Sequence, residues 1–107
     1  MREVDLDAFA VAWAEGALVL DVREPEEYRA GHVPGARLAP LSVLAAAAGE
    51  VPKDRPVYVI CASGNRSQWA AERLAAVGVD AVSVAGGTSG WARTGRPLVT
   101  GPESGAK

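Results

Sequence analysis

The sequence predicts one α/β domain in which a parallel sheet is covered by helices on both faces. Short apolar runs alternate along the chain with segments of helical character, which is the order that parallel sheets require. The runs are nearly continuous in their apolar character, as in residues 57–60 (VYVI), and this is typical of strands buried on both faces. The chain has 107 residues, of which 49% are hydrophobic and 22% charged, so it can form a core without metals or disulfides.

The first element is predicted to be an amphipathic helix that begins after Asp5 and ends before Gly16. Aspartate is a residue type that caps the start of a helix, and glycine commonly ends one. Apolar side chains recur between these two residues at positions i, i+3, i+4 and i+7: Leu6, Phe9, Ala10 and Trp13. This spacing places them along one side of the helix, where the sheet can bury them.

A strand and a short helix are expected next. Residues 17–22 (ALVLDV) form an apolar run that is typical of a buried strand. Pro25 fits the first position of a helix, and Glu26 and Glu27 fit its first turn, where the helix dipole favours negative charge. This helix is expected to end before Gly31.

The remaining elements continue the alternation. Strands are expected at residues 36–39, 57–60 and 81–84, and helices at residues 42–48, from residue 65 to Gly78, and at residues 89–93. The longest of these helices is predicted to bury one face, which carries Ala70, Ala71, Leu74 and Val77. The domain is expected to cover residues 1–100, and the Gly-, Ser- and Pro-containing segment 101–107 is expected to be a flexible tail.

The composition argues against several classes of function. A formal net charge of −2 does not favour binding to nucleic acid. With one cysteine, Cys61, and one histidine, His32, no internal disulfide can form, and neither a metal site nor a cofactor is expected. No apolar run is long enough to span a membrane. An unpaired thiol and the lack of a signal-peptide pattern predict a protein of the reducing cytoplasm.

The residues best suited to chemistry follow the strand at 57–60, and we call them the cup: Cys61, Ala62, Ser63, Gly64, Asn65, Arg66 and Ser67. Ligands of parallel α/β sheets bind beyond the carboxyl ends of the strands, where this segment would lie. Its small residues allow backbone N–H groups to turn towards the sulfur. The start of the next helix and the guanidinium of Arg66 can both lower the pKa of the thiol. A lone cysteine often simply packs in a core, but this setting favours a reactive thiolate.

The sequence resembles the rhodanese family of sulfurtransferases along nearly the whole chain. The matching segments are residues 21–24 (DVRE), 27–28 (EY), 31–36 (GHVPGA), 61–67 (CASGNRS) and 86–88 (GGT), with Trp91. The resemblance implies a mostly parallel, five-stranded sheet flanked by helices on both faces. It also implies that Cys61 takes a sulfur atom from thiosulfate or a persulfide, becomes a persulfide, and passes the sulfur to cyanide or a thiol.

The residue types of the cup suit this chemistry. The N–H groups from Ala62 to Ser67 would hold the anionic donor and the persulfide, and Arg66 would add a fixed positive charge. Because the chain has no second cysteine, an external acceptor must remove the sulfur, which predicts ping-pong kinetics. The acceptor is expected to be a small thiol, cyanide or a sulfur-relay protein.

Two features of the cup bear on the choice of substrate. Related loops often have a basic residue directly after the cysteine, whereas this chain has Ala62, so donors of low charge can compete with thiosulfate. Cysteine phosphatases and arsenate reductases of similar fold place one residue more between cysteine and arginine than the four found here, and phosphate chemistry is therefore less favoured. A persulfide carrier without enzymatic turnover is the other alternative.

Five side chains outside the cup are further candidates, of which Asp21, His32 and Trp91 are expected to be structural supports near the site. Arg23 is predicted either to bind an anionic donor or to pair with Asp21, which is expected to be structural and ends its strand at the same edge of the sheet. His32 lies in a Gly-His-Val-Pro-Gly turn and is expected to support that turn. Of the two tryptophans that could wall the pocket, Trp91 is the better candidate and Trp69 the weaker one, with core packing as the alternative for both.

Overall fold

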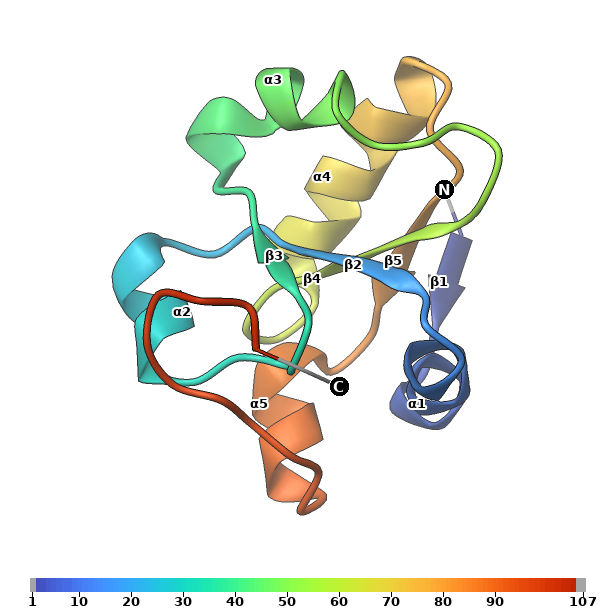
Figure 1. The fold of residues 1–107 in the computed structure, drawn as a ribbon. Helices are drawn as coiled ribbons and strands as arrows, with labels where there is room; N and C mark the ends of the chain where they lie inside the picture. Colours follow the sequence, from blue (N-terminus) through green and yellow to red (C-terminus); the bar gives the residue numbers. More distant parts are fainter. Residues whose placement is uncertain (1, 106–107) are drawn as a thin grey trace.

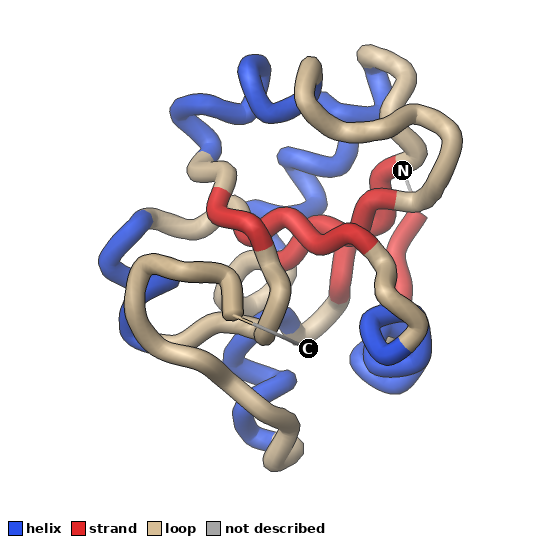
Figure 2. Tube along the Cα trace, viewed as in Figure 1, coloured by secondary structure: helices blue, strands red, loops and turns tan. Residues whose placement is uncertain are grey.

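The computed structural model describes residues 2–105, which form one layer of strands with helices on either side (Figure 1, Figure 2). The elements follow in the order β1 (Arg2–Val4), α1 (Leu6–Ala14), β2 (Leu18–Asp21), α2 (Pro25–Ala30), β3 (Arg37–Leu38), the 3-10 turn η1 (Leu41–Val43), α3 (Leu44–Ala48), β4 (Val57–Ile60), α4 (Asn65–Ala76), β5 (Ala81–Val84) and α5 (Gly87–Arg93). The alternation of strands and helices predicted from the sequence is therefore present.

The strands form one five-stranded sheet in the order β1-β5-β4-β2-β3, and every neighbouring pair is parallel. Figure 1 shows α3 and α4 on one face of the sheet and α1 and α5 on the other. The predicted fold class is confirmed, and the sheet of the described residues is parallel throughout rather than mostly parallel. Because parallel strands have their carboxyl ends at the same edge of the sheet, the loops that follow β2, β4 and β5 all begin at that edge.

β1 is the strand that the sequence analysis does not place. It pairs with β5 at the edge of the sheet, with Arg2 opposite Val82 and Val4 opposite Val84. The strand has three residues, and the first two are charged and exposed. It has neither the length nor the apolar pattern of a buried strand, so only its pairing with β5 identifies it.

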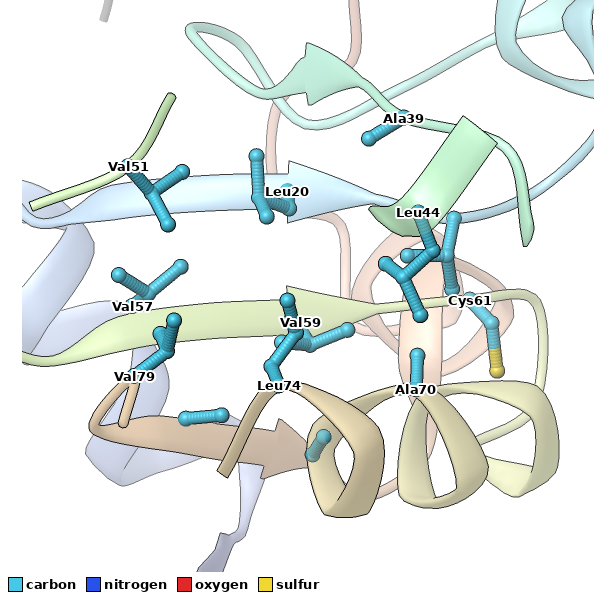
Figure 3. Close-up of a cluster of buried hydrophobic side chains, with 13 residues drawn as sticks. Leu20, Ala39, Leu44, Val51, Val57, Val59, Cys61, Ala70, Leu74 and Val79 are labelled. Carbon is cyan, nitrogen blue, oxygen red and sulfur yellow. The ribbon is translucent and has the colours of Figure 1, made fainter. Parts of the chain in front are cut away.

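Two hydrophobic clusters fill the space between the sheet and its helices. Val57, Val59 and Cys61 belong to the cluster under α3 and α4, which Figure 3 shows in close-up. Ile60 belongs to the cluster on the opposite face, together with Trp91 of α5. Successive side chains of a strand point to opposite faces of the sheet. The alternation along β4 therefore directs the Cys61 side chain towards α4.

Helix boundaries differ from the prediction in three places. Residues 41–43 form a 3-10 turn after Pro40, and the α-helix proper begins only at Leu44. α5 begins at Gly87 rather than at residue 89, so Gly87 and Thr88 already belong to the helix. α4 ends at Ala76, and Val77, which the sequence predicts to be buried, caps the helix and is 52% exposed.

The C-terminal segment returns to the body of the fold. The N–H of Gly101 donates to the carbonyl of Arg29 at 2.9 Å, and the N–H of Gly35 donates to the carbonyl of Ser104 at 2.7 Å. Gly101 and Ser104 are thus hydrogen-bonded to α2 and to the turn that follows it. The flexibility expected for this segment stays a prediction. Residues 106–107 of the expected tail lie outside the described residues.

Within residues 2–105, no helix has the length and apolar character needed to cross a membrane. The same residues bring together no group of three or more histidine, cysteine, aspartate or glutamate side chains that could hold a metal ion.

Candidate active site

The cup lies at the carboxyl edge of the sheet, as the sequence predicts. Cys61 directly follows β4, residues 62–64 form a tight loop, and α4 begins at Asn65. The Cys61 side chain is 1% exposed and points towards the first turns of α4 (Figure 3). The loop therefore wraps around a buried sulfur atom.

Two groups of the cup contact the sulfur directly. The N–H of Gly64 donates to Sγ of Cys61 at 3.1 Å, and the hydroxyl of Ser67 lies 3.6 Å from Sγ. Ser67 is itself held in place, because its hydroxyl donates to the Gly64 carbonyl at 3.1 Å and lies 2.9 Å from the Ser83 hydroxyl. A hydroxyl has one proton and rotates freely. The Ser67 hydroxyl can therefore accept a hydrogen bond from Cys61 when it is a thiol, and can donate one to it when it is a thiolate.

The outer side of the cup is fixed by the start of α5. The N–H of Thr88 donates to the Cys61 carbonyl at 2.8 Å, and the N–H of Ser89 donates to the Ala62 carbonyl at 3.0 Å. Gly87 makes this approach possible, because a Cβ at this position would lie 2.5 Å from both carbonyl oxygens. With the carbonyls bound outside, the N–H groups of the loop are left to face the sulfur.

These contacts determine the acidity of Cys61. Burial raises the pKa of the thiol, but hydrogen bonds from the Ser67 hydroxyl and from the N–H groups of Ser67, Gly64 and Ser63 outweigh it. The pKa therefore lies below its ordinary value of 9.0. A lowered pKa increases the fraction of thiolate, which is the nucleophilic form. This direction agrees with the one expected from the sequence, and the Coulomb interaction of Arg66 with Cys61 is among the smaller causes that raise the pKa of Arg66.

The Arg66 guanidinium forms an ion pair with Glu27 of α2. Its two terminal nitrogens donate to the two carboxylate oxygens at 2.7 and 2.9 Å, and both side chains are about one-third exposed. The hydrogen bond from Arg66 is the largest cause that lowers the pKa of Glu27 to about 2, and Glu27 in turn raises the pKa of Arg66. The positive charge that the sequence assigns to the cup is thus neutralised at its rim.

Glu27 is the residue at this site that the sequence analysis did not connect with the cup. The sequence predicts Glu27 as an acidic residue of the first turn of a helix, and the structure places it there. Its carboxylate also accepts the N–H of Glu24 at 3.0 Å. Its pairing with Arg66 joins residues that are 39 positions apart. The only signal in the sequence was the Glu27-Tyr28 segment of the family resemblance.

Arg23 belongs to the scaffold beneath the rim rather than to an open binding surface. Its side chain is 7% exposed and pairs with the fully buried carboxylate of Asp21 at 2.8 Å. The same guanidinium donates to the Gly31 carbonyl at 2.9 Å. Of the two alternatives for Arg23, the structure favours the pairing with Asp21, which ties the end of β2 to the end of α2.

His32 is fully buried and connects three segments of the chain. Its ring stacks on Tyr28, with ring centroids 3.6 Å apart. Its Nδ1 lies 2.7 Å from the Tyr28 carbonyl, and its Nε2 lies 2.9 Å from the Glu103 carbonyl. These contacts engage both ring nitrogens with backbone carbonyls. The supporting role of His32 stays a prediction.

The two tryptophans lie in different surroundings, one in the core and one at the surface. Trp91 is fully buried on the face of the sheet opposite to Cys61, where it packs edge-on against Phe9 and Trp13. It supports α5 and does not wall a pocket. Trp69 is 44% exposed and lines a groove of about 350 Å³ between α3 and α4. The spacing within the sequence could not show which face of the sheet each helix would cover.

The other members of the cup contribute mainly through their backbone. Ala62 presents its carbonyl to α5, and the N–H of Ser63 is directed at the sulfur, while the Ser63 side chain is exposed. Asn65 is the first residue of α4, and its side chain is also exposed. The exposed side chains of these residues lie at the outer surface of the cup.

The parallel sheet, with a buried cysteine at its carboxyl edge inside a loop whose N–H groups face the sulfur, defines the class of α/β proteins with a thiol at the end of a central strand. Within that class, the chain belongs to the rhodanese family, because the profile of the rhodanese-like domain matches residues 8–94. The sequence resemblance described above is therefore confirmed, and it includes the whole cup.

The chain is similar to several proteins with known names or known structures. A sulfurtransferase from Allochromatium vinosum is 35% identical over 102 residues, which cover 92% of this chain and 95% of that protein. A rhodanese-related protein of known crystal structure from Thermoplasma volcanium is 34% identical, with a TM-score of 0.86, and the match covers 92% of this chain and 98% of that one. A Bacillus subtilis protein that carries the provisional name sulfur carrier protein YrkF is 38% identical over 92 residues, 83% of this chain and 50% of that protein.

Proposed function

We propose that the protein is a sulfurtransferase that carries sulfur as a persulfide on Cys61. The observation that carries this proposal is the environment of Sγ, which accepts the Gly64 N–H at 3.1 Å inside a loop whose carbonyls are bound from outside by α5. N–H groups oriented in advance stabilise negative charge without having to reorganise during the reaction. Both the thiolate and the persulfide anion carry such a charge.

In the first half-reaction, the Cys61 thiolate attacks the outer sulfur of the donor. With thiosulfate, the S–S bond of the donor breaks, sulfite leaves with the bonding electron pair, and a persulfide remains on Cys61. With a low-molecular-weight persulfide as donor, a thiolate leaves instead. The lowered pKa of Cys61 supports this step, because it increases the fraction of Cys61 that is the nucleophilic thiolate.

In the second half-reaction, an acceptor attacks the outer sulfur of the Cys61 persulfide. Cyanide would become thiocyanate, and a thiolate would become a new persulfide, while Cys61 leaves as a thiolate. Neither half-reaction requires a general base, and the two nitrogens of His32 are engaged with backbone carbonyls. We therefore assign no proton-transfer role to His32.

Thiosulfate:cyanide sulfur transfer by the wild type, Cys61→Ser and Ser63→Ala tests the proposal. We expect Cys61→Ser to lose thiocyanate formation entirely, because a hydroxyl cannot carry the sulfur. Ser63→Ala is the control, because the side chain of Ser63 is exposed, and it should retain activity. Thiocyanate formation that persists in Cys61→Ser would overturn the proposal.

A persulfide carrier that receives sulfur from a partner protein is the second candidate. Two observations favour it: the provisional name of the Bacillus subtilis relative, and the neutralised Arg66, which weakens attraction for a small anionic donor. Intact-mass spectrometry separates the two functions. A stable gain of about 32 Da, the mass of about one sulfur atom, without turnover of small donors would assign the carrier role, and rapid turnover would assign the enzyme.

We further infer that either function operates in a reducing compartment such as the cytoplasm. Cys61 is the only cysteine of the chain, and an oxidising environment would consume an unpaired reactive thiol. Localisation of the full-length protein in cells tests this inference.

A further inference from the structure

On the basis of the sulfur transfer proposed above, we propose that Glu27 selects the sulfur donor by charge. By neutralising Arg66 at the rim of the cup, Glu27 disfavours dianionic thiosulfate relative to donors that carry less charge. Glu27 would thus act through Arg66 as a residue that determines specificity, without touching the sulfur that is transferred.

The geometry of the pair makes the neutralisation effective. The Glu27 carboxylate takes both terminal nitrogens of Arg66 in a two-point contact, at 2.7 and 2.9 Å. Such paired contacts are stronger and more directional than a single hydrogen bond. Arg66 is 37% and Glu27 34% exposed, so an incoming donor meets the two opposite charges together.

The pair is ionised under all conditions in which the protein would work. The pKa of Glu27 is lowered to about 2, chiefly by the hydrogen bond from Arg66, and the pKa of Arg66 is raised by Glu27. At neutral pH the rim therefore carries one positive and one negative charge. A dianion gains no net attraction from such a rim.

Neighbouring cations do not replace the charge of Arg66. Arg23 is buried and paired with Asp21, and the position after Cys61 is occupied by Ala62. Arg73 lies on the same side of α4 but stacks on Trp69. It is seven positions from Arg66, which corresponds to about 10 Å along a helix. The charge balance at the rim thus depends on Glu27.

Removing the negative charge at the rim should favour donors in proportion to their own charge. The interaction energy of a donor with the rim scales with the donor's charge. A dianion therefore gains twice the interaction energy that a monoanion gains. Because rate depends exponentially on energy, a variant that gains about threefold with a monoanion should gain about tenfold with a dianion.

The experiment compares wild type and Glu27→Gln with two donors of matched chemistry, thiosulfate and methanethiosulfonate. Both offer a terminal sulfur to the Cys61 thiolate, and they release sulfite and methanesulfinate respectively. The first donor carries two negative charges and the second carries one. We expect Glu27→Gln to raise kcat/KM about tenfold for thiosulfate and about threefold for methanethiosulfonate, so the preference for thiosulfate rises about threefold. The glutamine amide oxygen can still accept the Glu24 N–H, which the carboxylate accepts at 3.0 Å.

Glu26→Gln is the matched control. Glu26 is the preceding residue of α2 and is exposed, so the variant changes net charge equally without affecting Arg66. Its donor preference should equal that of the wild type. Arg66→Gln and the double variant complete a charge series, in which the preference for thiosulfate should fall in the order Glu27→Gln, then wild type and the double variant together, then Arg66→Gln. Thermal unfolding of each variant confirms that folded proteins are compared.

The outcomes separate this inference from the function on which it rests. If the wild type forms the Cys61 persulfide but Glu27→Gln changes both donors equally or neither, the role of Glu27 is overturned and sulfur transfer stands. An equal change of preference in Glu26→Gln would also overturn it. If no donor produces a persulfide on wild-type Cys61, the proposed function itself fails.

Discussion

The base and the rim of the cup are built from different parts of the protein. The base consists of backbone N–H groups around Cys61, held in place because Gly87 lets the start of α5 bind the carbonyls of the loop. The rim is one ion pair between the half-buried side chains of Arg66 and Glu27. Backbone groups are placed by the packing of whole helices, whereas a surface ion pair contributes little to stability. On the proposed function, reactivity of the sulfur and selection of its donor should therefore be separable by substitution.

The largest expected effect comes from breaking the base with Gly87→Ala. A Cβ at Gly87 would lie 2.5 Å from the carbonyl oxygens of Cys61 and Ala62, at a backbone φ of +58°. Overpacking costs about 1–3 kcal/mol and a left-handed non-glycine residue about 1–2 kcal/mol. We expect urea unfolding to show a loss of about 2–5 kcal/mol, together with loss of activity.

Gly95→Ala is the matched control for this prediction. Gly95 has a φ of +78°, but no atom lies within 4 Å of its Cβ position. The variant should lose only the stability that a left-handed backbone costs a non-glycine residue, about 1–2 kcal/mol, and should keep its activity. Equal losses in the two variants would show that the approach of α5 to the cup is not what makes Gly87 necessary.

Ser67→Ala should have an intermediate effect, confined to the acidity of the sulfur. The variant removes the hydroxyl that lies 3.6 Å from Sγ and leaves the Ser83 hydroxyl without this partner. The pKa of Cys61 should rise, because the largest contribution that lowers it is lost. The pH profile of alkylation by iodoacetamide should shift to higher pH, with a loss of about 1–2 kcal/mol in stability. An unchanged profile would contradict the role of Ser67 in the base.

The smallest effect is expected at the rim, in the acid stability of Glu27→Gln. The pKa of Glu27 is about 2 in the folded protein, below its ordinary value of 4.5. The stabilisation from this lowered pKa is present above about pH 4.5 and is lost as the pH falls towards 2. The wild type should therefore lose more stability than Glu27→Gln over this range. The difference should stay within about 1 kcal/mol, since the pair is partly exposed, and denaturant titrations at several pH values would measure it.

Local patterns were sufficient to predict most of the fold. Asp5 accepts the N–H of Ala8 as a helix cap, Pro25 begins α2, and Cys61 follows β4 at the carboxyl edge of the sheet. Each of these features depends on residues close together in the sequence. Short-range chemistry therefore predicts the elements and the position of the nucleophile.

Features that depend on contacts between distant segments were not predicted. Arg2 to Val4 become a strand only through β5, and Trp91 is in the core because α5 crosses the face opposite to Cys61. Arg66 pairs with Glu27 because the fold brings α2 close to the start of α4. The sequence placed the positive charge of the cup but could not show that a carboxylate would neutralise it.

The return of the C-terminal segment has a practical consequence for handling the protein. Glu103 and Ser104 provide the carbonyls that receive His32 Nε2 and the Gly35 N–H. His32 and Gly35 lie in the turn directly after α2, the helix that carries Glu27. Truncation at residue 100 would remove these hydrogen bonds, and a bulky tag fused close behind residue 105 would disturb them. Either change would loosen the attachment of α2 to the rest of the domain. Altered donor preference in such a preparation would then report the change at the chain end and not a property of the native protein.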